Sequence, residues 1–473
     1  MPACAIQGPL IYAIIALKLF QIIYFSKFRT LFYAYDLALP APEAHNSTRA
    51  RPPLRVPVEG GTFVMTQGNN DLRRAFKPIT LGPVQLRNRF VKAGTFEGMN
   101  AENAPTAALR RHHVDIAAGG TAMTTLGYTS INPDGRTFEE ETYICDRNVE
   151  SFRALTDAVH AAGAKVSLQL GHCGTMTRTQ NREIRKPGGP STTVNLYGAM
   201  VGALRTRAMS EADIANTTAA FVEAARLAQS SGFDAIELHM GHGYLLSQFL
   251  SPLANRRTDR YGGSPENRAR FPVAVAEQVM KAVGTKMAIL AKLNLRDGAR
   301  GGVEVSDSIV TARALAAVGL NAIVMTGGFS PYSPMYLFRG ASPVPAMLVT
   351  EKSRWNRFLL RLGAKTAFRD MPFEELYFLQ HARKMREALD LPLGLLGGVR
   401  TADNVATAMR EGFDFVQMAR PLIAEPDFVR KLEQGDSLSS KCNNCNQCVA
   451  EFSAAGGLRC VLNAPNDATL NQH

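Results

Sequence analysis

Residues 232–246 read Gly-Phe-Asp-Ala-Ile-Glu-Leu-His-Met-Gly-His-Gly-Tyr-Leu-Leu, an apolar run that ends in two imidazoles and a phenol. The segment 233–239 has the composition of a parallel strand that is buried on both faces. Titratable groups directly after such a strand, here His239, His242 and Tyr244, are typical of the end of an α/β barrel that carries the chemistry. The stretch therefore predicts a barrel strand and a catalytic site at its carboxyl end.

Strand-like and helix-like segments alternate along most of the chain. Strand-like runs occur at 88–93, 121–128, 165–170, 233–239, 287–293, 320–326, 392–397 and 413–418. Helical patterns occur among them at 149–162, 210–230, 265–283, 305–318, 373–389 and 402–411. This order predicts an α/β fold, a closed (β/α)8 TIM barrel. An open doubly wound sheet is disfavoured because no Gly-x-Gly-x-x-Gly turn follows the first strand.

The 473 residues divide into four predicted parts. Residues 1–39 form a hydrophobic membrane-anchor or targeting segment, and residues 40–71 form a linker. Residues 72–435 form the barrel, which is followed by a cysteine-containing tail at 436–473. Within the barrel, irregular sequence at 172–209 and 328–372 predicts two long insertions.

The apolar stretch 9–25 has three interpretations: a membrane anchor, a cleaved signal or organelle-targeting segment, and an ordinary helix. Lys27 and Arg29 follow it, and basic residues on this side favour a catalytic domain in the cytoplasm. We therefore expect membrane association through residues 9–25, with a mitochondrion or another organelle as the alternative location. The basic amphipathic pattern at 354–365 predicts either a second membrane contact or an ordinary lid helix.

The formal net charge is +12, from 53 basic and 41 acidic residues, and the excess is spread along the chain. A spread excess favours anionic membranes or phosphorylated ligands modestly. No basic-aromatic recognition module is present, so we expect no nucleic-acid partner.

Two neighbouring strand ends carry residues suited to a phosphate. Gly397-Gly398-Val399 ends the seventh strand and Ala419-Arg420-Pro421 ends the eighth. Bare backbone N–H groups and a guanidinium can surround a phosphate at this position in a barrel. Turn glycines without a ligand are the alternative interpretation for Gly397 and Gly398.

With the long stretch from His239 to Arg268, these features resemble the old yellow enzyme family of FMN-dependent oxidoreductases over residues 72–430. The resemblance implies that FMN lies across the carboxyl end of the barrel. Gln169 matches the residue that bonds the pyrimidine edge of the flavin, and Lys292 matches the cation that stabilises its reduced form. The other positions expected to contact FMN are Ala93, Gly94, Thr95, Gly127, Gly397, Gly398, Val399, Ala419 and Arg420.

The resemblance also implies the reaction. NAD(P)H reduces the flavin, and a small activated alkene, conjugated to a carbonyl, is then reduced. His239 and His242 match the pair that holds the substrate oxygen, and Tyr244 matches the proton donor. The expected function is an ene-reductase-like NAD(P)H oxidoreductase; a catalytically inactive, membrane-tethered flavin-binding scaffold is a non-enzymatic alternative.

Four cysteines lie in the tail at short spacings, namely Cys442, Cys445, Cys448 and Cys460. One branch of the family, which includes dienoyl-CoA reductase and trimethylamine dehydrogenase, has a similar run that binds a 4Fe–4S cluster. That branch has three residues, not two, between its second and third cysteines. The thiols here predict a cluster, a zinc site or a metal-free tail. A cluster would make the protein an iron–sulfur flavoprotein that passes electrons to a partner.

Overall fold

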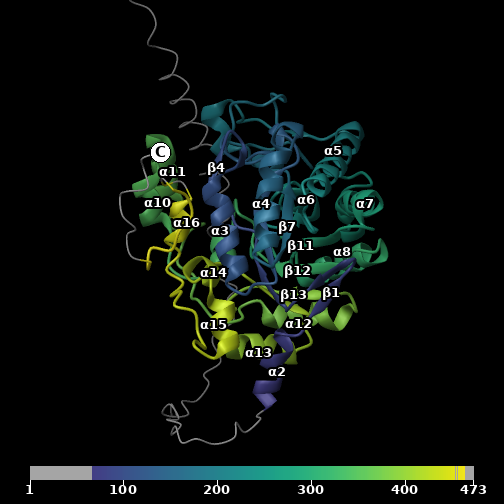
Figure 1. The fold of residues 1–473 in the computed structure, drawn as a ribbon. Helices are drawn as coiled ribbons and strands as arrows, with labels where there is room; N and C mark the ends of the chain where they lie inside the picture. The colour runs from purple at the N-terminus through teal and green to yellow at the C-terminus, as the bar shows by residue number, and fades with distance from the viewer. Residues whose placement is uncertain (1–66, 453, 455, 464–473) are drawn as a thin grey trace, which may run out of the picture. The chain divides into compact units, whose positions relative to one another are not determined.

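The computed structural model describes residues 67–452, 454 and 456–463, and its centre is a closed barrel (Figure 1). Eight strands pair in parallel in the order β10-β11-β12-β13-β14-β3-β6-β7. Their bounds are β3 (Phe90–Lys92), β6 (Met123–Ser130), β7 (Lys165–Gly171), β10 (Ala235–Met240), β11 (Ala288–Asn294), β12 (Ala322–Thr326), β13 (Leu393–Leu395) and β14 (Phe415–Met418). All eight predicted strands and the predicted barrel are confirmed.

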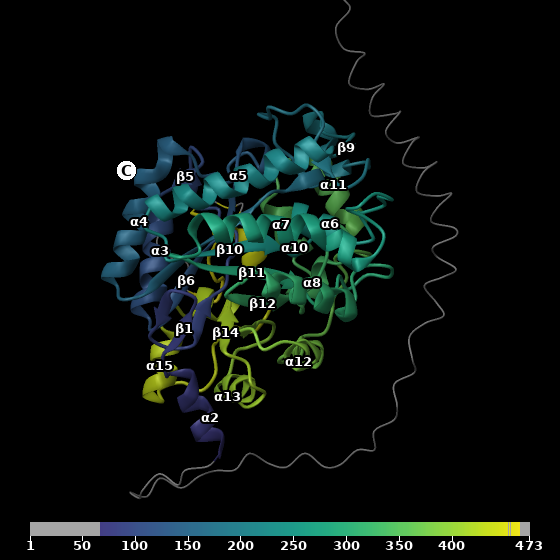
Figure 2. The same ribbon diagram turned by 90° about the vertical axis from the view of Figure 1, so that its right-hand side faces the viewer.

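Helices surround the barrel, as Figures 1 and 2 show together. They are α3 (Ala107–Ala118), α4 (Val149–Ala161), α5 (Glu211–Ser230), α7 (Pro265–Val283), α8 (Val305–Ala317), α12 (Leu379–Ala388) and α13 (Ala402–Arg410). Six of these match predicted helices. The helix predicted at 373–389 begins only at Leu379, and α3 was not predicted. Thr106 caps α3 by accepting the N–H of Leu109.

A two-stranded hairpin, β1 (Ile79–Leu81) and β2 (Val84–Leu86), closes one end of the barrel. Its apolar side chains share one buried cluster with residues near the start of the strands, among them Ala235, Ala288 and Ala322. Burial of these side chains inside the barrel fills the end where the strands begin. The opposite end, where the strands finish, is left for the predicted site.

Two long segments follow strands at that end. The β7 loop (residues 172–209) contains the short strands β8 (Gly188–Gly189) and β9 (Arg207–Ala208). The β12 insertion (residues 328–372) contains α9 (Pro334–Phe338), α10 (Val344–Thr350) and α11 (Arg354–Gly363). In α11 Leu360 is buried, whereas Phe358 and Leu362 are 44% and 45% exposed. The predicted amphipathic helix therefore exists, and both of its interpretations stay open.

The remaining elements lie at the edges of the barrel. They are α2 (Gln67–Ala75), β4 (Asn100–Ala101), β5 (Ala104–Pro105), α6 (Leu245–Leu250), α14 (Arg420–Ala424), α15 (Phe428–Gln434) and α16 (Cys448–Glu451). Helix α2 begins at Gln67, inside the segment 40–71 predicted as a linker. The stretch 9–25 lies outside the described residues. Among the helices that the structure describes, none has the length and apolar character needed to cross a membrane.

Candidate functional site

Three predicted catalytic side chains meet at the carboxyl end of β10. The ring centroids of His239 and His242 are 5.0 Å apart, and those of His239 and Tyr244 are 4.5 Å apart. His239 belongs to β10 itself, whereas His242 lies in the turn that leads to α6 and Tyr244 is the cap residue of α6. The strand, the turn and the helix therefore bring the predicted imidazoles and phenol into one group.

The turn between β10 and α6 is held in an uncommon backbone conformation. His242 has φ of +59°, in the left-handed region that non-glycine residues rarely adopt. Its N–H donates to Oδ1 of Asn294 at 3.2 Å, and its Nε2 lies 2.8 Å from Oγ1 of Thr326. These contacts to β11 and β12 fix the ring of His242 next to His239. Strain held by surrounding contacts is common at functional sites.

Both imidazoles are neutral at neutral pH. Burial, followed by the charges of His242 and Lys292, holds the pKa of His239 well below its ordinary value. Burial and then the charge of Lys292 lower the pKa of His242 to about 3. Nδ1 of His239 accepts the N–H of Gly241 at 3.3 Å, which assigns the ring proton to Nε2. His239 can therefore donate a hydrogen bond without carrying a charge.

Tyr244 keeps its proton for a related reason. Burial is the largest cause that raises the pKa of its phenol above the ordinary value, and the charge of the nearby Glu141, once that group is ionised, adds to the effect. The ring stacks on Tyr128 with centroids 4.6 Å apart. Tyr128 was missed by the sequence analysis, although its position directly after Gly127, at the end of a strand, could have indicated it.

Inside the barrel, the carboxylate of Glu237 on β10 contacts side chains of three other strands. Glu237 forms an ion pair with Lys292 at 2.9 Å, and both side chains are almost completely buried. It also accepts hydrogen bonds from Nε2 of Gln169 at 2.6 Å and from Nε2 of Gln417 at 2.8 Å. The sequence analysis explained Lys292 by an anionic cofactor alone and missed Glu237 and Gln417. A charged residue within the apolar strand 233–239 was the available signal.

The ends of the first two barrel strands pass very close to one another. A Cβ atom at Gly127 would lie 1.5 Å from the carbonyl oxygen of Thr95, so only glycine fits there. A Cβ atom at Gly94 would lie 2.9 Å from Nε2 of Gln169. Ala93 is buried beside them. The predicted cofactor residues at these two strand ends are therefore neighbours.

Thr95 differs from the other residues predicted to contact FMN. Its hydroxyl donates to Glu97 at 2.8 Å and accepts from Nζ of Lys92 at 3.1 Å. Lys92 and Glu97 form a second buried ion pair. The hydroxyl of Thr95 is thus used within the protein, and its backbone is what borders Gly127.

The loops after β13 and β14 carry the predicted phosphate residues. Gly397 and Gly398 have φ of +103° and +78°, conformations that favour glycine. Val399 is buried, and Ala419 immediately precedes α14. Nη1 of Arg420 donates to the carbonyl of Arg339 at 3.0 Å and to Oδ1 of Asn446 at 2.6 Å. Since β13 and β14 pair with each other, these loops leave neighbouring strands.

The tail cysteines pack against the helix that begins with Arg420. Cys442 and Cys460 share a buried cluster with residues of α14, and Cys448 lies against it. Burial raises the pKa of Cys442 and raises that of Cys448 to about 12. Within residues 67–452, 454 and 456–463, no three His, Cys, Asp or Glu side chains are placed to hold a metal ion. The predicted cluster or zinc site is therefore not supported.

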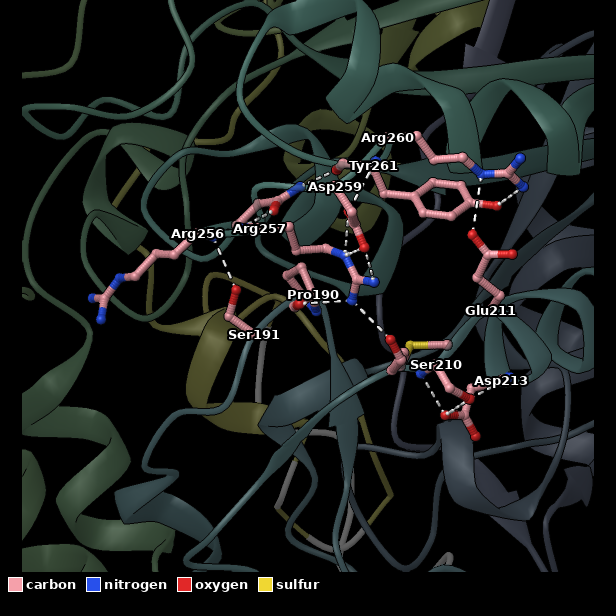
Figure 3. Close-up of polar contacts among 12 residues, drawn as sticks. Pro190, Ser191, Ser210, Glu211, Asp213, Arg256, Arg257, Asp259, Arg260 and Tyr261 are labelled. Carbon is pink, nitrogen blue, oxygen red and sulfur yellow. Dashed lines mark hydrogen bonds and ion pairs between the residues drawn. The ribbon is translucent and has the colours of Figure 1, made fainter.

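The arginine-rich stretch 255–263 fastens the β7 loop to the barrel (Figure 3). Nη1 of Arg257 donates to the carbonyl oxygens of Met209 at 2.7 Å and Pro190 at 3.1 Å. Its Nε donates to Asp259 at 2.9 Å, which fixes the guanidinium in place. In the contacts shown, these residues have a structural role, holding a loop that borders the imidazole and phenol group.

Comparison with known proteins agrees with this arrangement. Residues 74–328 match the NADH:flavin oxidoreductase / NADH oxidase family. A 4,4'-dithiodibutanoate disulfide reductase of Rhodococcus erythropolis is 40% identical over 388 residues, which cover 82% of this chain and 94% of that protein. A metal reductase of Desulforamulus reducens is 28% identical over 392 residues, which are 82% of this chain but 53% of that protein. The chain thus spans about half the length of this second relative.

The fold is also found in solved structures. The old yellow enzyme homologue from Zymomonas mobilis superposes with a TM-score of 0.61 at 22% identity, covering 78% of this chain and 95% of that chain. The family match, the relative that is 40% identical to this chain, and the barrel with the site at its carboxyl end lead to one conclusion. This chain belongs to the NADH:flavin oxidoreductase / NADH oxidase family, the FMN-dependent oxidoreductases of the old yellow enzyme type that use NAD(P)H.

Proposed function

We propose that the protein reduces small activated alkenes, in which a C=C bond is conjugated to a carbonyl group. The observation that carries this proposal is the group of His239, His242 and Tyr244, two neutral imidazoles and a protonated phenol. Neutral donors can polarise a carbonyl oxygen, and the phenol can supply a proton.

The residues of the barrel fit FMN. Oε1 of Gln417 is buried without a hydrogen-bond partner among the described residues, so it can accept a hydrogen bond from a ligand. Gly94, Gly397 and Gly398 lie at strand ends where a side chain would meet neighbouring residues, and Lys292 places a cation in the barrel interior. Gln169, Lys292 and the loops after β13 and β14 are the residues that would hold the cofactor. Bound FMN, once reduced by NAD(P)H, supplies a hydride to the β-carbon of the alkene.

The protein's own groups complete the addition. His239 and His242 donate hydrogen bonds to the carbonyl oxygen and stabilise the negative charge that develops on it. Tyr244 gives its proton to the α-carbon and regains one from solvent. One hydride and one proton are added across the double bond, and NAD(P)H is oxidised to NAD(P)+.

Disulfide reduction is a second proposal, because a relative 40% identical to the chain is named a disulfide reductase. In that reaction NAD(P)H and one proton convert a small organic disulfide into two thiols. The departing sulfur is stable as a thiolate near neutral pH, so it depends less on a proton donor than a carbon does. Tyr244 therefore distinguishes the two reactions.

Anaerobic stopped-flow measurements test both proposals. Flavin bleaching by NADPH and NADH is recorded first, and reoxidation by cyclohexenone or by 4,4'-dithiodibutanoate follows. We expect Tyr244→Phe to bleach at nearly the normal rate and to reduce the enone about 100-fold more slowly, a typical loss for a general acid. Disulfide reduction should change much less. Tyr128→Phe, which removes the stacked neighbouring phenol, is the matched control.

The outcomes are distinct. If Tyr244→Phe loses bleaching by the nicotinamide, the proton-donor role is wrong. If the wild-type flavin is reoxidised by the disulfide but not by any enone, disulfide reduction replaces alkene reduction as the proposed activity. Bound flavin that neither nicotinamide can bleach would support the inactive scaffold.

We also propose membrane association through residues 9–25, with the catalytic domain in the cytoplasm. The support is the apolar composition of that stretch and the basic residues after it. Fractionation of cells that express the full chain or residues 40–473 tests it. A full chain that stays in the soluble fraction contradicts the anchor. A shortened chain that still sediments with membranes points instead to helix α11.

A further inference from the structure

We infer that Glu237 is a positioning residue for the flavin site: its carboxylate orients Gln169 and Gln417 and balances the charge of Lys292. The inference rests on the proposed function in one respect, namely that FMN occupies the carboxyl end of this barrel. It does not depend on which substrate is reduced.

The position of Glu237 lets it reach across the barrel. Gln169 is its direct register partner on the neighbouring strand β7, and Lys292 lies on the other neighbour, β11. Gln417 belongs to β14, which is the fourth strand from β10 in either direction around the closed barrel and therefore lies opposite it. One carboxylate thus connects both sides of the barrel interior, and its side chain is 1% exposed.

The carboxylate also decides which way the two amides face. A carboxylate only accepts hydrogen bonds, so each glutamine must present its NH2 group to Glu237. The carbonyl oxygens of Gln169 and Gln417 are then left as acceptors for another group. In Gln417 this oxygen is buried and unpartnered among the described residues. The flavin ring carries a ring N–H donor that such an oxygen can accept.

The carboxylate of Glu237 balances the charge of Lys292 without any contribution from a reduced cofactor. Its ammonium lies 2.9 Å from the carboxylate in a site closed to water. Reduction places negative charge on a flavin, and a free cation would favour that change more than a paired one. Glu237 therefore keeps the potential of bound FMN low, which makes the reduced cofactor a stronger hydride donor.

The experiment replaces Glu237 by Gln and measures the midpoint potential of bound FMN with reference dyes. We expect the potential to become more positive and reoxidation by an enone to slow at least 10-fold, while bleaching by NADPH is not slowed. Glu97→Gln is the matched control, because it breaks the other buried Lys–Glu pair and leaves Glu237 with its two glutamines in place. Its potential should stay close to that of the wild type.

An unchanged or more negative potential in Glu237→Gln that still binds FMN would overturn the charge role. Lys292→Gln alone should make the potential more negative, and adding Glu237→Gln to it should not raise the potential again, since Glu237 acts through Lys292. A rise in the double variant relative to Lys292→Gln would also contradict the inference. Failure of alkene reduction in the wild type would affect only the proposed substrate, because potentials are measured without an alkene.

A second variant tests the orientation role if Glu237→Gln does not fold. Gln417→Met removes one amide but keeps the ion pair of Lys292 and Glu237. We expect FMN to bind about 10-fold more weakly, with a potential close to the wild-type value. Unchanged FMN affinity in Gln417→Met would show that this amide is not an acceptor for the cofactor.

Discussion

Two buried Lys–Glu pairs in the described part of the chain look alike in isolation. Lys92 and Glu97 are 0% and 3% exposed, and Lys292 and Glu237 are 2% and 1% exposed. The pairs differ in what surrounds them. Lys92 lies on β3 near His113 of α3, whereas Lys292 points into the barrel interior beside two glutamines.

The first pair is a closed network. The ammonium of Lys92 donates to Glu97, to the hydroxyl of Thr95 at 3.1 Å and to the carbonyl oxygen of Thr125 at 3.2 Å, which uses all three of its donors. Such a network stabilises the fold and leaves the ammonium of Lys92 no N–H to offer a ligand.

The second pair is an open network. In the described part of the chain, the one ion-pair partner of Lys292 is Glu237, so its ammonium has donors to spare. Of the two glutamines bound to the same carboxylate, Gln417 keeps a carbonyl oxygen without a partner among the described residues. Equal burial therefore does not mean equal function; unused donors and acceptors distinguish the pair prepared for a cofactor.

The largest expected effect is on the closed pair. Glu97→Gln should lower the free energy of unfolding by about 3–5 kcal/mol, because Lys92 would be left buried without its counter-charge. Burial already lowers the pKa of Lys92, and Glu97 opposes that shift. Urea denaturation measures the loss. Adding Lys92→Met should recover part of it; no recovery would show that the loss comes from something other than the unpaired charge.

For the open pair, we expect a smaller effect on the stability of the protein and a larger effect on its affinity for FMN. Lys292→Gln should weaken FMN binding about 10- to 100-fold. This range corresponds to the loss of one hydrogen bond to a charged group, which contributes about 1.5–3 kcal/mol. The carboxylate of Glu237 keeps its two amide donors, so the apoprotein should lose less stability than in Glu97→Gln. Flavin fluorescence titration measures the affinity. Equal losses of stability in both variants would contradict the distinction between closed and open networks.

The sequence predicted the elements whose signals are local. Each barrel strand is a short apolar run between polar segments, and the group of His239, His242 and Tyr244 lies within six residues. Such local features were sufficient to predict the barrel and to place the two imidazoles and the phenol together at the carboxyl end of β10.

The contacts between distant strands could not be predicted in the same way. Gln417 meets Glu237 across a barrel interior, at 180 residues of separation, and nothing near either residue indicates the contact. The stacking of Tyr128 on Tyr244 could not be predicted for the same reason, because Tyr128 belongs to a strand far away in the sequence. For the tail, the cysteine spacing left a cluster, a zinc site and a metal-free tail open, and the described residues do not support either metal site.

The comparison extends to a buried carboxyl that, among the described residues, has no cationic partner at hydrogen-bond distance. Burial raises the pKa of Glu141 to about 8, opposed by the backbone N–H groups of Thr137 and Phe138. The folded protein therefore keeps this proton up to about pH 8, while the unfolded chain releases it near its ordinary pKa of 4.5. The folded state binds more protons, so stability falls as the pH rises through this range.

Glu141→Gln should remove that dependence. Between about pH 7 and pH 8 the wild type should lose up to about 1.4 kcal/mol from this group, and the variant should not. The buried histidines do not interfere, because the lowered pKa of His242 costs stability only as the pH falls below about 6.5. Denaturation at several pH values measures the slope. Parallel slopes for the two proteins would show that Glu141 is ionised in the folded state.

The smallest effect is expected where a Lys–Glu pair lies in water. Lys281 and Glu277 are 2.7 Å apart on one face of α7, and their side chains are 63% and 41% exposed. Water and salt screen this pair, so Lys281→Ala should change the free energy of unfolding by no more than about 0.5 kcal/mol. Denaturation at low and high salt tests this value. A loss as large as that of Glu97→Gln would mean that distance alone sets the strength of these pairs, whereas a small loss shows that burial and completed hydrogen bonding do.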